Sequence, residues 1–410
     1  MEIREGYKQT EVGIIPENWR VSSLFDLAER KKALFDDGDW IESEHITNEG
    51  IRLIQTGNIG EGKYLEKEIK KYIYPKSFEV LKCKELQVGD LLICRLAEPA
   101  GRACIFEKLE DQKVVTSVDV TIYRPPLKSV NRSYLNQIFS SKNWLNSVSE
   151  NSGGTTHKRI SRGSLGKLLV PIPEITEQTA IATALSDTDV LITSLEKLIK
   201  KKKEIKLGSM QELLRPKEGW EVKKLGDIAN IIGGGTPSTF ISQYWNGTIN
   251  WFTPTEIGIN KYTYESQRKI TNEGLSNCSA RILPVGTILL TSRAGIGDLS
   301  ILMSEGCTNQ GFQSLISKEG YSNEYLYYLM QTLKTILLKN ASGSTFLEIS
   351  PDKIKQIEVS LPTYDEQLGI AAILSDMDAE ITTVEQKLAK YKLIKQGMMQ
   401  ELLTGKIRLV

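Results

Sequence analysis

The residues of this chain that offer recognisable chemistry lie in short polar loops. Residues 152–162 read SGGTTHKRISR, so small polar side chains stand beside one lysine and two arginines. Hydroxyls, backbone N–H groups and basic side chains are the usual ligands of DNA phosphates. Asn309 and Gln310 carry amides, which can pair with the edge of an adenine. Together these loops favour a surface that contacts DNA.

Further loops carry side chains of the same kinds. Arg95 and Arg102 flank a loop rich in Gly and Pro, and residues 233–238 read GGGTPS. Taken singly, each loop is explained equally well as an ordinary surface loop, and the glycine run as a tight turn after a strand or helix end. The loop at 342–350 resembles the one at 152–162 but lacks its Lys and Arg residues, which weakens the prediction there. The predicted DNA-binding residues are Arg95, Arg102, Ser117, Thr155, Thr156, Lys158, Arg159, Arg162, Gly234, Thr236, Ser238, Thr255, Ser292, Arg293, Asn309, Gln310, Ser344 and Thr345.

No group of residues in the sequence has the spacing of a catalytic or cofactor site. The run at 233–238 lacks the Gly-Lys-Ser/Thr ending of a phosphate-binding loop and is not a GxGxxG fingerprint. The Asn/Asp-Pro-Pro-Tyr/Phe motif of amino-methyltransferases is missing, and two histidines limit general-base chemistry built on His. Five widely spaced cysteines without a CxxC favour buried free thiols over a zinc site or a disulfide. We therefore predict no catalytic, cofactor-binding or metal-binding residue.

The framework that positions these loops contains one stretch twice. Residues 177–214 begin EQTAIATALSD and residues 366–403 begin EQLGIAAILSD, and both end MQELL. The two copies align without a gap, which indicates two copies of one structural unit. Neither copy contains proline, and apolar residues recur at alternating steps of three and four. This pattern predicts two long helices, each with a heptad seam.

A helix of this length, about 57 Å, needs a partner along its seam. We expect the two copies to pair with each other as an antiparallel coiled coil, with the globular parts related by a pseudo-two-fold axis. The alternative is that each seam packs on its own globular domain. The first copy turns polar at Lys202 and Lys206, which the seam alone does not explain. The predicted helix-pairing residues are Ile181, Leu185, Ile192, Leu195, Ile199, Ile370, Leu374, Met377, Ile381, Val384 and Leu388.

The globular parts repeat weakly but in the same order. Residues 53–59 correspond to 251–257, and residues 116–119 correspond to 308–311. Short apolar runs between turn residues predict strands, while amphipathic stretches at 133–148 and elsewhere predict helices. The fold class is therefore α+β with mostly antiparallel strands. The predicted boundaries are 1–172 for the first globular domain, 173–214 for the central helical region, 215–361 for the second globular domain and 362–410 for the C-terminal helical region.

Charge and hydropathy bear on where the protein acts and what it binds. The chain has 410 residues and a formal net charge of +1, so bulk charge does not announce a nucleic-acid binder. Exposed lysines such as those at 200–203 are better explained as a solvated helix face than as a basic patch. No apolar run approaches a membrane span, and the polar N-terminus has no signal-peptide core. We expect a cytoplasmic protein.

With these motifs in place, the sequence resembles the specificity subunits of type I restriction-modification systems. The resemblance covers nearly the whole chain. It depends on GYKQTEVGIIPENW at 6–19, on GGTPS at 234–238, on TNQGF at 308–312, and on the ending LLTGKIR. It also depends on Glu-Gln-x-x-Ile-Ala at the start of both repeated helices. The tandem order of domain and helix carries more weight than any single motif.

The resemblance implies two target-recognition domains, each of which reads one half of an interrupted site in double-stranded DNA. It implies that the helical regions dock two methyltransferase subunits and that restriction/translocase subunits join a larger complex. S-adenosylmethionine would then belong to the methyltransferase partner, and ATP and magnesium to the restriction partner. The chain itself would have no cofactor and no enzymatic activity.

Two other interpretations remain open on the sequence. One is a non-catalytic coiled-coil scaffold whose two domains bind proteins or glycans. The other is a self-sufficient methyltransferase, which the missing motifs disfavour.

Overall fold

The computed structural model describes residues 3–154, 158–293, 295–343 and 347–409. The chain divides into two compact units. Unit 1 comprises Met1–Glu196 and Gln386–Val410, and unit 2 comprises Lys197–Glu385. The long helices α6 (Ile175–Leu213) and α12 (Tyr364–Leu402) therefore contribute one part to each unit.

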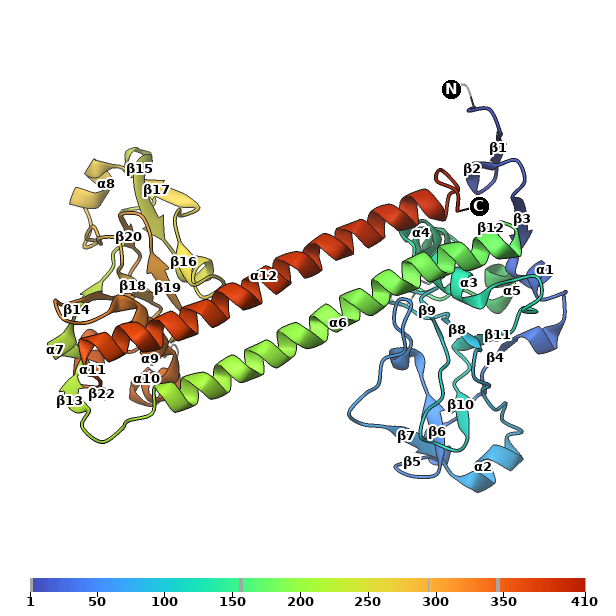
Figure 1. Ribbon diagram of the computed structural model, residues 1–410, viewed down its shortest axis with the longest axis horizontal. Coiled ribbons are helices and arrows are strands. Elements are labelled where there is room, and N and C mark those ends of the chain that lie inside the picture. The colour runs from blue at the N-terminus through green and yellow to red at the C-terminus, as the bar shows by residue number, and fades with distance from the viewer. Residues whose placement is uncertain (1–2, 155–157, 294, 344–346, 410) are drawn as a thin grey trace. The chain divides into compact units, whose positions relative to one another are not determined.

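Unit 1 is a mixture of short strands and helices (Figure 1). Two of its sheets have four strands each, in the orders β10-β6-β7-β5 and β4-β11-β8-β9. The strands are β1 Tyr7–Thr10, β2 Gly13–Pro16, β3 Arg20–Ser23, β4 Phe35–Asp37, β5 Ile46–Thr47, β6 Ile51–Ile54, β7 Lys71–Ile73, β8 Leu91–Cys94, β9 Ala103–Ile105, β10 Val114–Thr116, β11 Val120–Tyr123 and β12 Leu169–Ile172. The shorter helices are α1 Leu24–Leu27, α2 Pro75–Val80, α3 Arg132–Phe139, α4 Lys142–Glu150 and α5 Arg162–Lys167, with 3-10 turns η1 Lys32–Leu34, η2 Ser43–His45 and η3 Thr56–Asn58.

Unit 2 has the same kind of architecture. Its larger sheets have the orders β14-β21-β18-β19-β16 and β17-β15-β20. The strands are β13 Glu221–Lys224, β14 Ala229–Gly233, β15 Trp245–Phe252, β16 Tyr262–Thr263, β17 Arg268–Ile270, β18 Ile288–Leu290, β19 Leu299–Leu302, β20 Gly306–Thr308, β21 Gln313–Ser317 and β22 Glu358–Leu361. The shorter helices are α7 Leu225–Ile228, α8 Asn272–Ser276, α9 Asn323–Thr332, α10 Lys334–Asn340 and α11 Pro351–Lys355, with 3-10 turns η4 Ser242–Tyr244 and η5 Pro254–Glu256.

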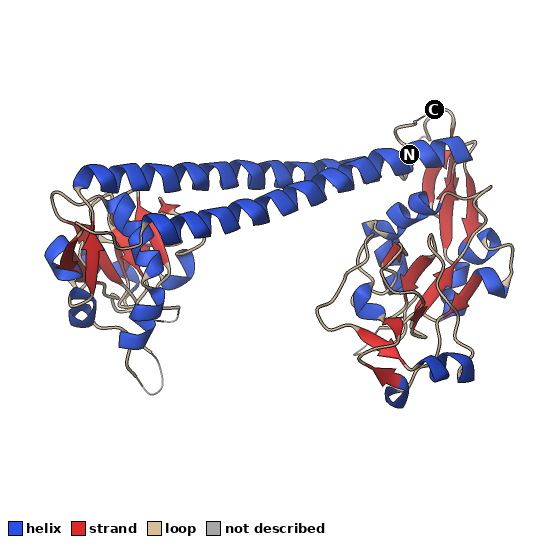
Figure 2. Cartoon of the chain, turned by 60° about the horizontal axis from the view of Figure 1, so that its bottom comes forward, coloured by secondary structure: helices blue, strands red, loops and turns tan. Residues whose placement is uncertain are grey.

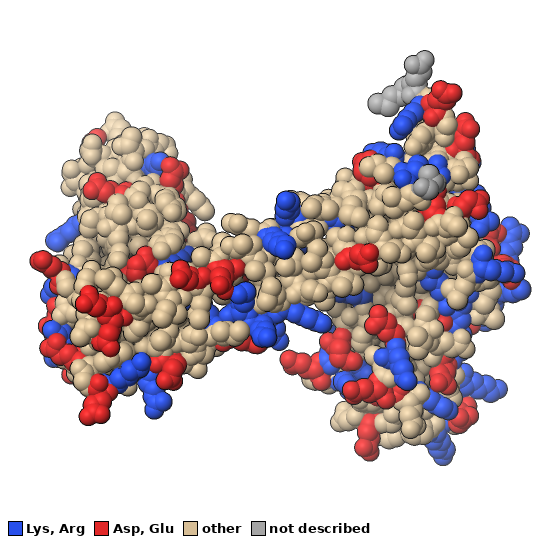
Figure 3. Space-filling model, viewed as in Figure 1, with Lys and Arg blue, Asp and Glu red and all other residues tan. Residues whose placement is uncertain are grey.

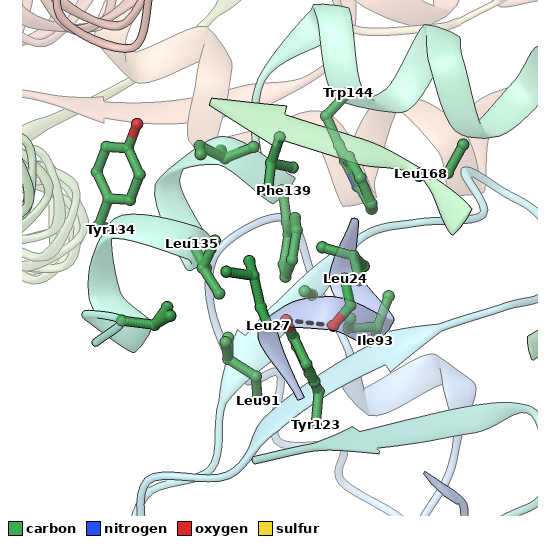
Figure 4. Close-up of a cluster of buried hydrophobic side chains, with 14 of the residues drawn as sticks. Leu24, Leu27, Leu91, Ile93, Tyr123, Tyr134, Leu135, Phe139, Trp144 and Leu168 are labelled. Carbon is green, nitrogen blue, oxygen red and sulfur yellow. Dashed lines mark hydrogen bonds between the residues drawn. The ribbon is translucent and has the colours of Figure 1, made fainter. Parts of the chain in front are cut away.

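The core of unit 1 joins the sheet to the helices that cover it. Tyr123 of β11 packs edge-on against Phe35 and donates a hydrogen bond from its hydroxyl to the carbonyl of Leu24, 2.9 Å away (Figure 4). The rings of Phe139 and Trp144 lie 4.5 Å apart in the same cluster. Each such ring removes a large apolar area from water, about 150–250 Å².

The start of each long helix belongs to a domain core. Ile181 and Leu185 of α6 are buried in the core of unit 1. Ile370 and Leu374 of α12 are buried in the core of unit 2. For this part of the seam, packing on the helix's own domain accounts for the apolar residues. The predicted helix-pairing residues further along are buried at Leu195, Ile199 and Ile381 and partly buried at Ile192, Met377, Val384 and Leu388.

Each repeated stretch forms one helix of 39 residues, as the periodicity predicts (Figure 2). Within unit 1, the two helices exchange ion pairs from Lys395 to Asp189, at 2.6 Å, and from Lys392 to Glu196, at 2.8 Å. The residue numbers fall on one helix as they rise on the other, so the two segments of unit 1 run antiparallel.

The two lysines that interrupt the apolar pattern have partners in unit 2. Lys202 pairs with Glu380 at 2.6 Å, and Lys206 pairs with Asp378. The hydroxyl of Tyr328 donates a second hydrogen bond to Asp378 at 2.7 Å. These lysines therefore bridge the two helix segments of unit 2, which explains their place on the seam.

Some predicted elements are interrupted in the structure. The stretch 133–148 forms α3 and α4, because the Ser141 hydroxyl caps a new helix by accepting a hydrogen bond from the Trp144 nitrogen. The apolar stretch 114–123 forms two strands, β10 and β11, which belong to different sheets. Over the described ranges, no helix combines the length and apolar character that crossing a membrane requires.

Candidate nucleic-acid interface

The same strand arrangement frames a polar edge in each unit. In unit 1, β6 and β10 run parallel, and Ile54 lies opposite Thr116 at their carboxyl ends. In unit 2, β15 and β20 run parallel, and Phe252 lies opposite Thr308. The loops that follow two neighbouring parallel strands leave the sheet at one edge. The weak sequence match between 53–59 and 251–257 therefore reflects a real structural correspondence.

A crowded glycine closes this edge in each unit. A Cβ atom on Gly38 would collide with the carbonyl oxygens of Thr116 and Ser117, and one on Gly234 would collide with those of Thr308 and Asn309. In each unit the residue after this glycine forms a backbone hydrogen bond to the last residue of the neighbouring strand. The nitrogen of Asp39 donates to the Thr116 oxygen at 2.8 Å, and the nitrogen of Gly235 donates to the Thr308 oxygen at 2.9 Å. Only glycine fits so close an approach. Gly38 was not among the predicted residues, because FDDGDW and IIGGGTPS share little beyond the glycine.

In unit 2, the structure brings several predicted residues together at this edge. The Thr236 hydroxyl donates a hydrogen bond to the Gln310 side chain. The Asn309 side-chain oxygen accepts a bond from the Gly311 nitrogen at 2.8 Å, which leaves its NH₂ group free of this contact. The hydroxyl of Thr255, in the neighbouring turn, lies 3.1 Å from that of Thr253. Thr236, Thr255, Gln310 and the nearby Ser238 are exposed, and Asn309 is partly exposed. This group can offer hydroxyls and amides to an external ligand.

Ser292 is a correction to the predicted set. Ser292 is fully buried. Its backbone nitrogen donates to the Gly311 carbonyl at 2.7 Å, and its backbone carbonyl accepts from the Ile349 nitrogen at 3.2 Å. Ser292 thus ties the loop at 309–311 to the end of the loop at 342–350 and cannot reach a ligand outside. Arg293 beside it is partly exposed and forms an ion pair with Glu348 at 2.8 Å.

The burial of Arg95 and Arg102 also contradicts their predicted contact with DNA. Arg102 donates to four backbone carbonyls, including those of Thr56 at 2.9 Å and Ile59 at 2.7 Å. Arg95 donates to the carbonyls of Val118 and Ile160, at 2.6 and 3.2 Å. Burial lowers the pKa of Arg95, and the nearby carboxylate of Asp37 opposes that shift. Both arginines fasten loops of the polar edge from within.

Two exposed basic residues of unit 1, Lys158 and Arg159, lie beside an antiparallel bridge between Gly153 and Arg159. Gly153 and Arg159 exchange two backbone hydrogen bonds, at 2.9 and 3.0 Å, and Ala97 donates to the Lys158 carbonyl at 2.9 Å. Lys158 and Arg159 are exposed, and Arg159 pairs with Asp119 at 2.7 Å. Arg159 is therefore held beside the strand-end loop 117–119. Four predicted residues, Thr155, Thr156, Ser344 and Thr345, lie outside the described residues.

The polar edge of unit 1 contains a hollow of about 480 Å³. Its walls come from the turn 55–58, from the loop 117–119 that holds Ser117, and from Trp40. The side chains of Lys67 and Lys71 complete the wall and are exposed. The turn, Trp40 and both lysines were not among the predicted residues. The repeat comparison had already matched the turn to 253–256, and that match was the signal for it.

The charges at this edge are mostly paired within the protein. Arg162 forms ion pairs with Asp36 and with Asp37, the latter at 3.7 Å. On the face drawn in Figure 3, acidic and basic side chains are interspersed over each unit rather than gathered by sign. For Arg159 or Arg162 to contact a phosphate, each would have to exchange a carboxylate for it.

Nothing in the described part of the chain resembles a metal centre, because no three His, Cys, Asp or Glu side chains there converge on one point. Four of the five free cysteines are buried. Burial raises the pKa of Cys104 and of Cys307 to about 12, which keeps both thiols protonated and unreactive near neutral pH.

Two α+β modules with matching polar edges define a binding protein made of two similar halves. The chain belongs to the family described as type I restriction modification DNA specificity domain, whose model matches residues 16–207 and 217–392. The name of this family refers to DNA specificity in type I restriction-modification systems.

Individual relatives agree with this assignment. The chain is 48% identical over 168 residues to the type I restriction enzyme MjaIX specificity subunit of Methanocaldococcus jannaschii, covering 40% of this chain and 38% of the relative. It is 27% identical over 262 residues to the EcoR124I/EcoR124II specificity subunit of Escherichia coli, covering 60% and 65%. The chain thus spans less than two thirds of the length of each of these relatives.

Solved structures share the fold at low sequence identity. The crystal structure of the type I restriction-modification S subunit from M. genitalium matches with a TM-score of 0.59 and 16% identity, over 98% of both chains. A chain from a structure on complex assembly and conformational transition of the type I R-M system matches with a TM-score of 0.57 and 16% identity, over 96% of this chain and 99% of that one.

Proposed function

We propose that this chain is the specificity subunit of a type I restriction-modification complex and that each globular domain reads one half of a bipartite DNA site. The observation that supports this proposal best is the polar edge that is built twice. The crowded glycine and the parallel strand pair are shared, whereas the exposed or partly exposed side chains differ: Ser117 and Lys67 in one unit, Asn309 and Gln310 in the other. A shared frame with different contacting groups suits the reading of two different half-sites.

The long helices have two roles in this proposal. They pair as an antiparallel coiled coil that sets the gap between the half-sites, and they dock two methyltransferase subunits. A helix of 39 residues spans about 58 Å at ~1.5 Å per residue. Half-sites on one face of B-DNA are separated by about 34 Å, so such a rod is long enough. The sequence similarity of the two helices is expected if both must fit the same partner.

The proposed chain is non-catalytic. S-adenosylmethionine would bind the methyltransferase subunits, and ATP and magnesium would serve the restriction/translocase subunits. In this scheme the boundaries 1–172, 173–214, 215–361 and 362–410 separate recognition domains from docking regions. The ion pairs between helix segments, such as Lys395 with Asp189 and Lys202 with Glu380, support the pairing.

A binding assay with the assembled methyltransferase tests the proposal. Host DNA modified by the complex supplies the bipartite sequence, and a duplex that carries it is compared with one in which both halves are scrambled. We expect tighter binding to the bipartite duplex and a steep fall in affinity with salt, because phosphate contacts release counterions. Equal affinity for both duplexes would favour the alternative of a scaffold that binds proteins or glycans.

A further inference from the structure

One exposed aromatic side chain follows the crowded glycine in each unit. Trp40 comes two residues after Gly38 and is 67% exposed, whereas Phe240 comes six residues after Gly234 and is 99% exposed. The other tryptophans, all of them described, are buried or partly buried. Leaving a large ring in water forgoes the gain from burying it. The two rings stand at different distances from their glycines, but each lies on the segment that leaves the polar edge, so contact with another molecule there would recover that gain.

The surroundings of Trp40 favour DNA as that molecule. Its ring lines the hollow formed by the turn 55–58 and the loop 117–119, beside the ammonium-bearing side chains of Lys67 and Lys71. Its indole nitrogen donates to Glu42 at 3.1 Å, which holds the ring at the rim. Cationic groups near an apolar ring suit a ligand that presents phosphates and stacked bases together.

Phe240 occupies the corner of a turn in unit 2. The nitrogen of Ile241 donates to the Ser238 carbonyl at 3.4 Å, and the indole nitrogen of Trp245 donates to the same carbonyl at 3.1 Å. These bonds fix the turn at its base while the ring stands clear of the protein. The turn begins at Ser238, two residues after Thr236, whose hydroxyl donates a hydrogen bond to the Gln310 side chain at the polar edge.

We infer that Trp40 and Phe240 are wedges, each of which inserts against a base step in the half-site read by its own unit. This inference rests on the proposed function. Proteins commonly place apolar side chains between base pairs to distort a duplex, and a base that is to be modified must leave the stack. The wedges would lower the cost of that distortion for the methyltransferase partner. Polar neighbours such as Gln310 would select the bases, and the rings would hold the distorted step.

The test measures binding of the assembled methyltransferase to its bipartite duplex, with Trp40→Ala and Trp40→Phe in the specificity chain. Loss of stacking on one aromatic ring corresponds to an affinity loss of about 5- to 140-fold. We expect a loss in that range for Trp40→Ala and substantial retention for Trp40→Phe. The control is Tyr74→Ala, because Tyr74 is also exposed but follows β7 at the end of the sheet away from the polar edge.

Two readouts separate a wedge from a structural or ionic role. The slope of log affinity against log salt should be unchanged in Trp40→Ala, whereas Lys67→Ala should make it shallower. On a duplex in which the half-site of unit 1 is scrambled, the wild type and Trp40→Ala should bind with equal affinity. On a duplex in which the half-site of unit 2 is scrambled, the wild type and Phe240→Ala should likewise bind with equal affinity. If Trp40→Ala and Phe240→Ala each bind the bipartite duplex with an affinity within twofold of the wild type, the wedge inference is overturned and the proposed function is not. Failure of the wild type to prefer the bipartite duplex would overturn the proposed function, and the inference with it.

Discussion

The side-chain oxygen of Gln178 accepts a hydrogen bond of 2.8 Å from the backbone nitrogen of Asn131, the residue that caps helix α3. Gln367 makes the same bond, at 3.0 Å, to Ser322, which caps α9. Each glutamine also donates to the carbonyl of the proline five residues before it. The glutamine of the Glu-Gln pair therefore links the start of each long helix to its globular domain. These glutamine contacts are the same in both copies.

Replacing either glutamine with alanine should loosen the unit to which it belongs. Each variant leaves a buried nitrogen and a buried carbonyl without partners, at a cost of about 1–3 kcal/mol. Hydrogen exchange of α3 should accelerate in Gln178→Ala, and that of α9 in Gln367→Ala. Gln396→Ala, on an exposed part of α12, is the matched control and should change neither helix. Unchanged exchange in all three variants would refute this link between helix and domain.

Arg408 should stabilise unit 1 through Glu177. The guanidinium binds both carboxylate oxygens at 2.6 and 2.8 Å, and the carboxylate also accepts a bond from the Trp19 indole. Glu177 is almost fully buried, so Arg408→Ala should destabilise unit 1 by up to about 3 kcal/mol. Lys406→Ala removes only an exposed pair and should cost less than about 0.5 kcal/mol. Equal denaturant midpoints for the two variants would contradict this role.

The crowded glycines should tolerate no side chain. In Gly38→Ala and Gly234→Ala the new Cβ meets backbone carbonyls, so the strand-end loops must shift and sequence-specific DNA binding should fall at least tenfold. Gly208 lies in α6 with open space around it, and Gly208→Ala should stabilise the helix by up to about 1 kcal/mol. Binding isotherms and thermal unfolding of the three variants check both expectations. Normal binding by Gly234→Ala would show that the loop has more room than the structure gives it.

Cysteine reactivity should follow burial. Cys104 and Cys307, with pKa values of about 12, hold almost no thiolate at pH 8 and should resist iodoacetamide until the protein unfolds. Cys278 is partly exposed and should react first. The thiolate fraction of Cys104 and of Cys307 grows as the pH approaches their raised pKa values. The reactivity of these two slow sites should therefore increase with pH. Mass spectrometry of peptides after timed alkylation measures the order, and rapid labelling of Cys104 in folded protein would contradict it.

The spacing role of the helices has its own test. One heptad inserted at equivalent places in α6 and α12 keeps the seam in phase and lengthens the rod by about 10 Å. The accepted gap between half-sites should lengthen while both half-sites stay the same. Selection of bound duplexes from a library with randomised gaps measures this, and an unchanged gap would argue against the ruler.

The parts of the fold that follow local rules were predictable, and those that depend on burial in loops were not. Apolar residues repeat at helical spacing in each of the two seams, one beginning at Ile181 and the other ending at Leu388. Both long helices could therefore be derived from the sequence. A loop has no such period, so the sequence does not say which side faces the core. That is why Arg102 and Ser292 were expected outside and lie inside. Gly38 escaped notice because its importance depends on a carbonyl 78 residues away, at Thr116.

The repeat comparison succeeded where it relied on order rather than on residue identity. It matched the turn at 53–59 with that at 251–257, and the strand pairings agree with that match. It also exposed the pair Lys202 and Lys206 as an anomaly, which the ion pairs with Glu380 and Asp378 now explain. Partners that lie far along the chain are beyond any pattern of one helix.

The most direct test of the central claim exchanges residues 20–150 for the corresponding segment of another family member and maps the modified bases in a host that expresses the chimera with its methyltransferase partner. We expect one half of the modified site to change while the other half and the gap stay as they were. A change in both halves, or in neither, would contradict the assignment of one half-site to each domain.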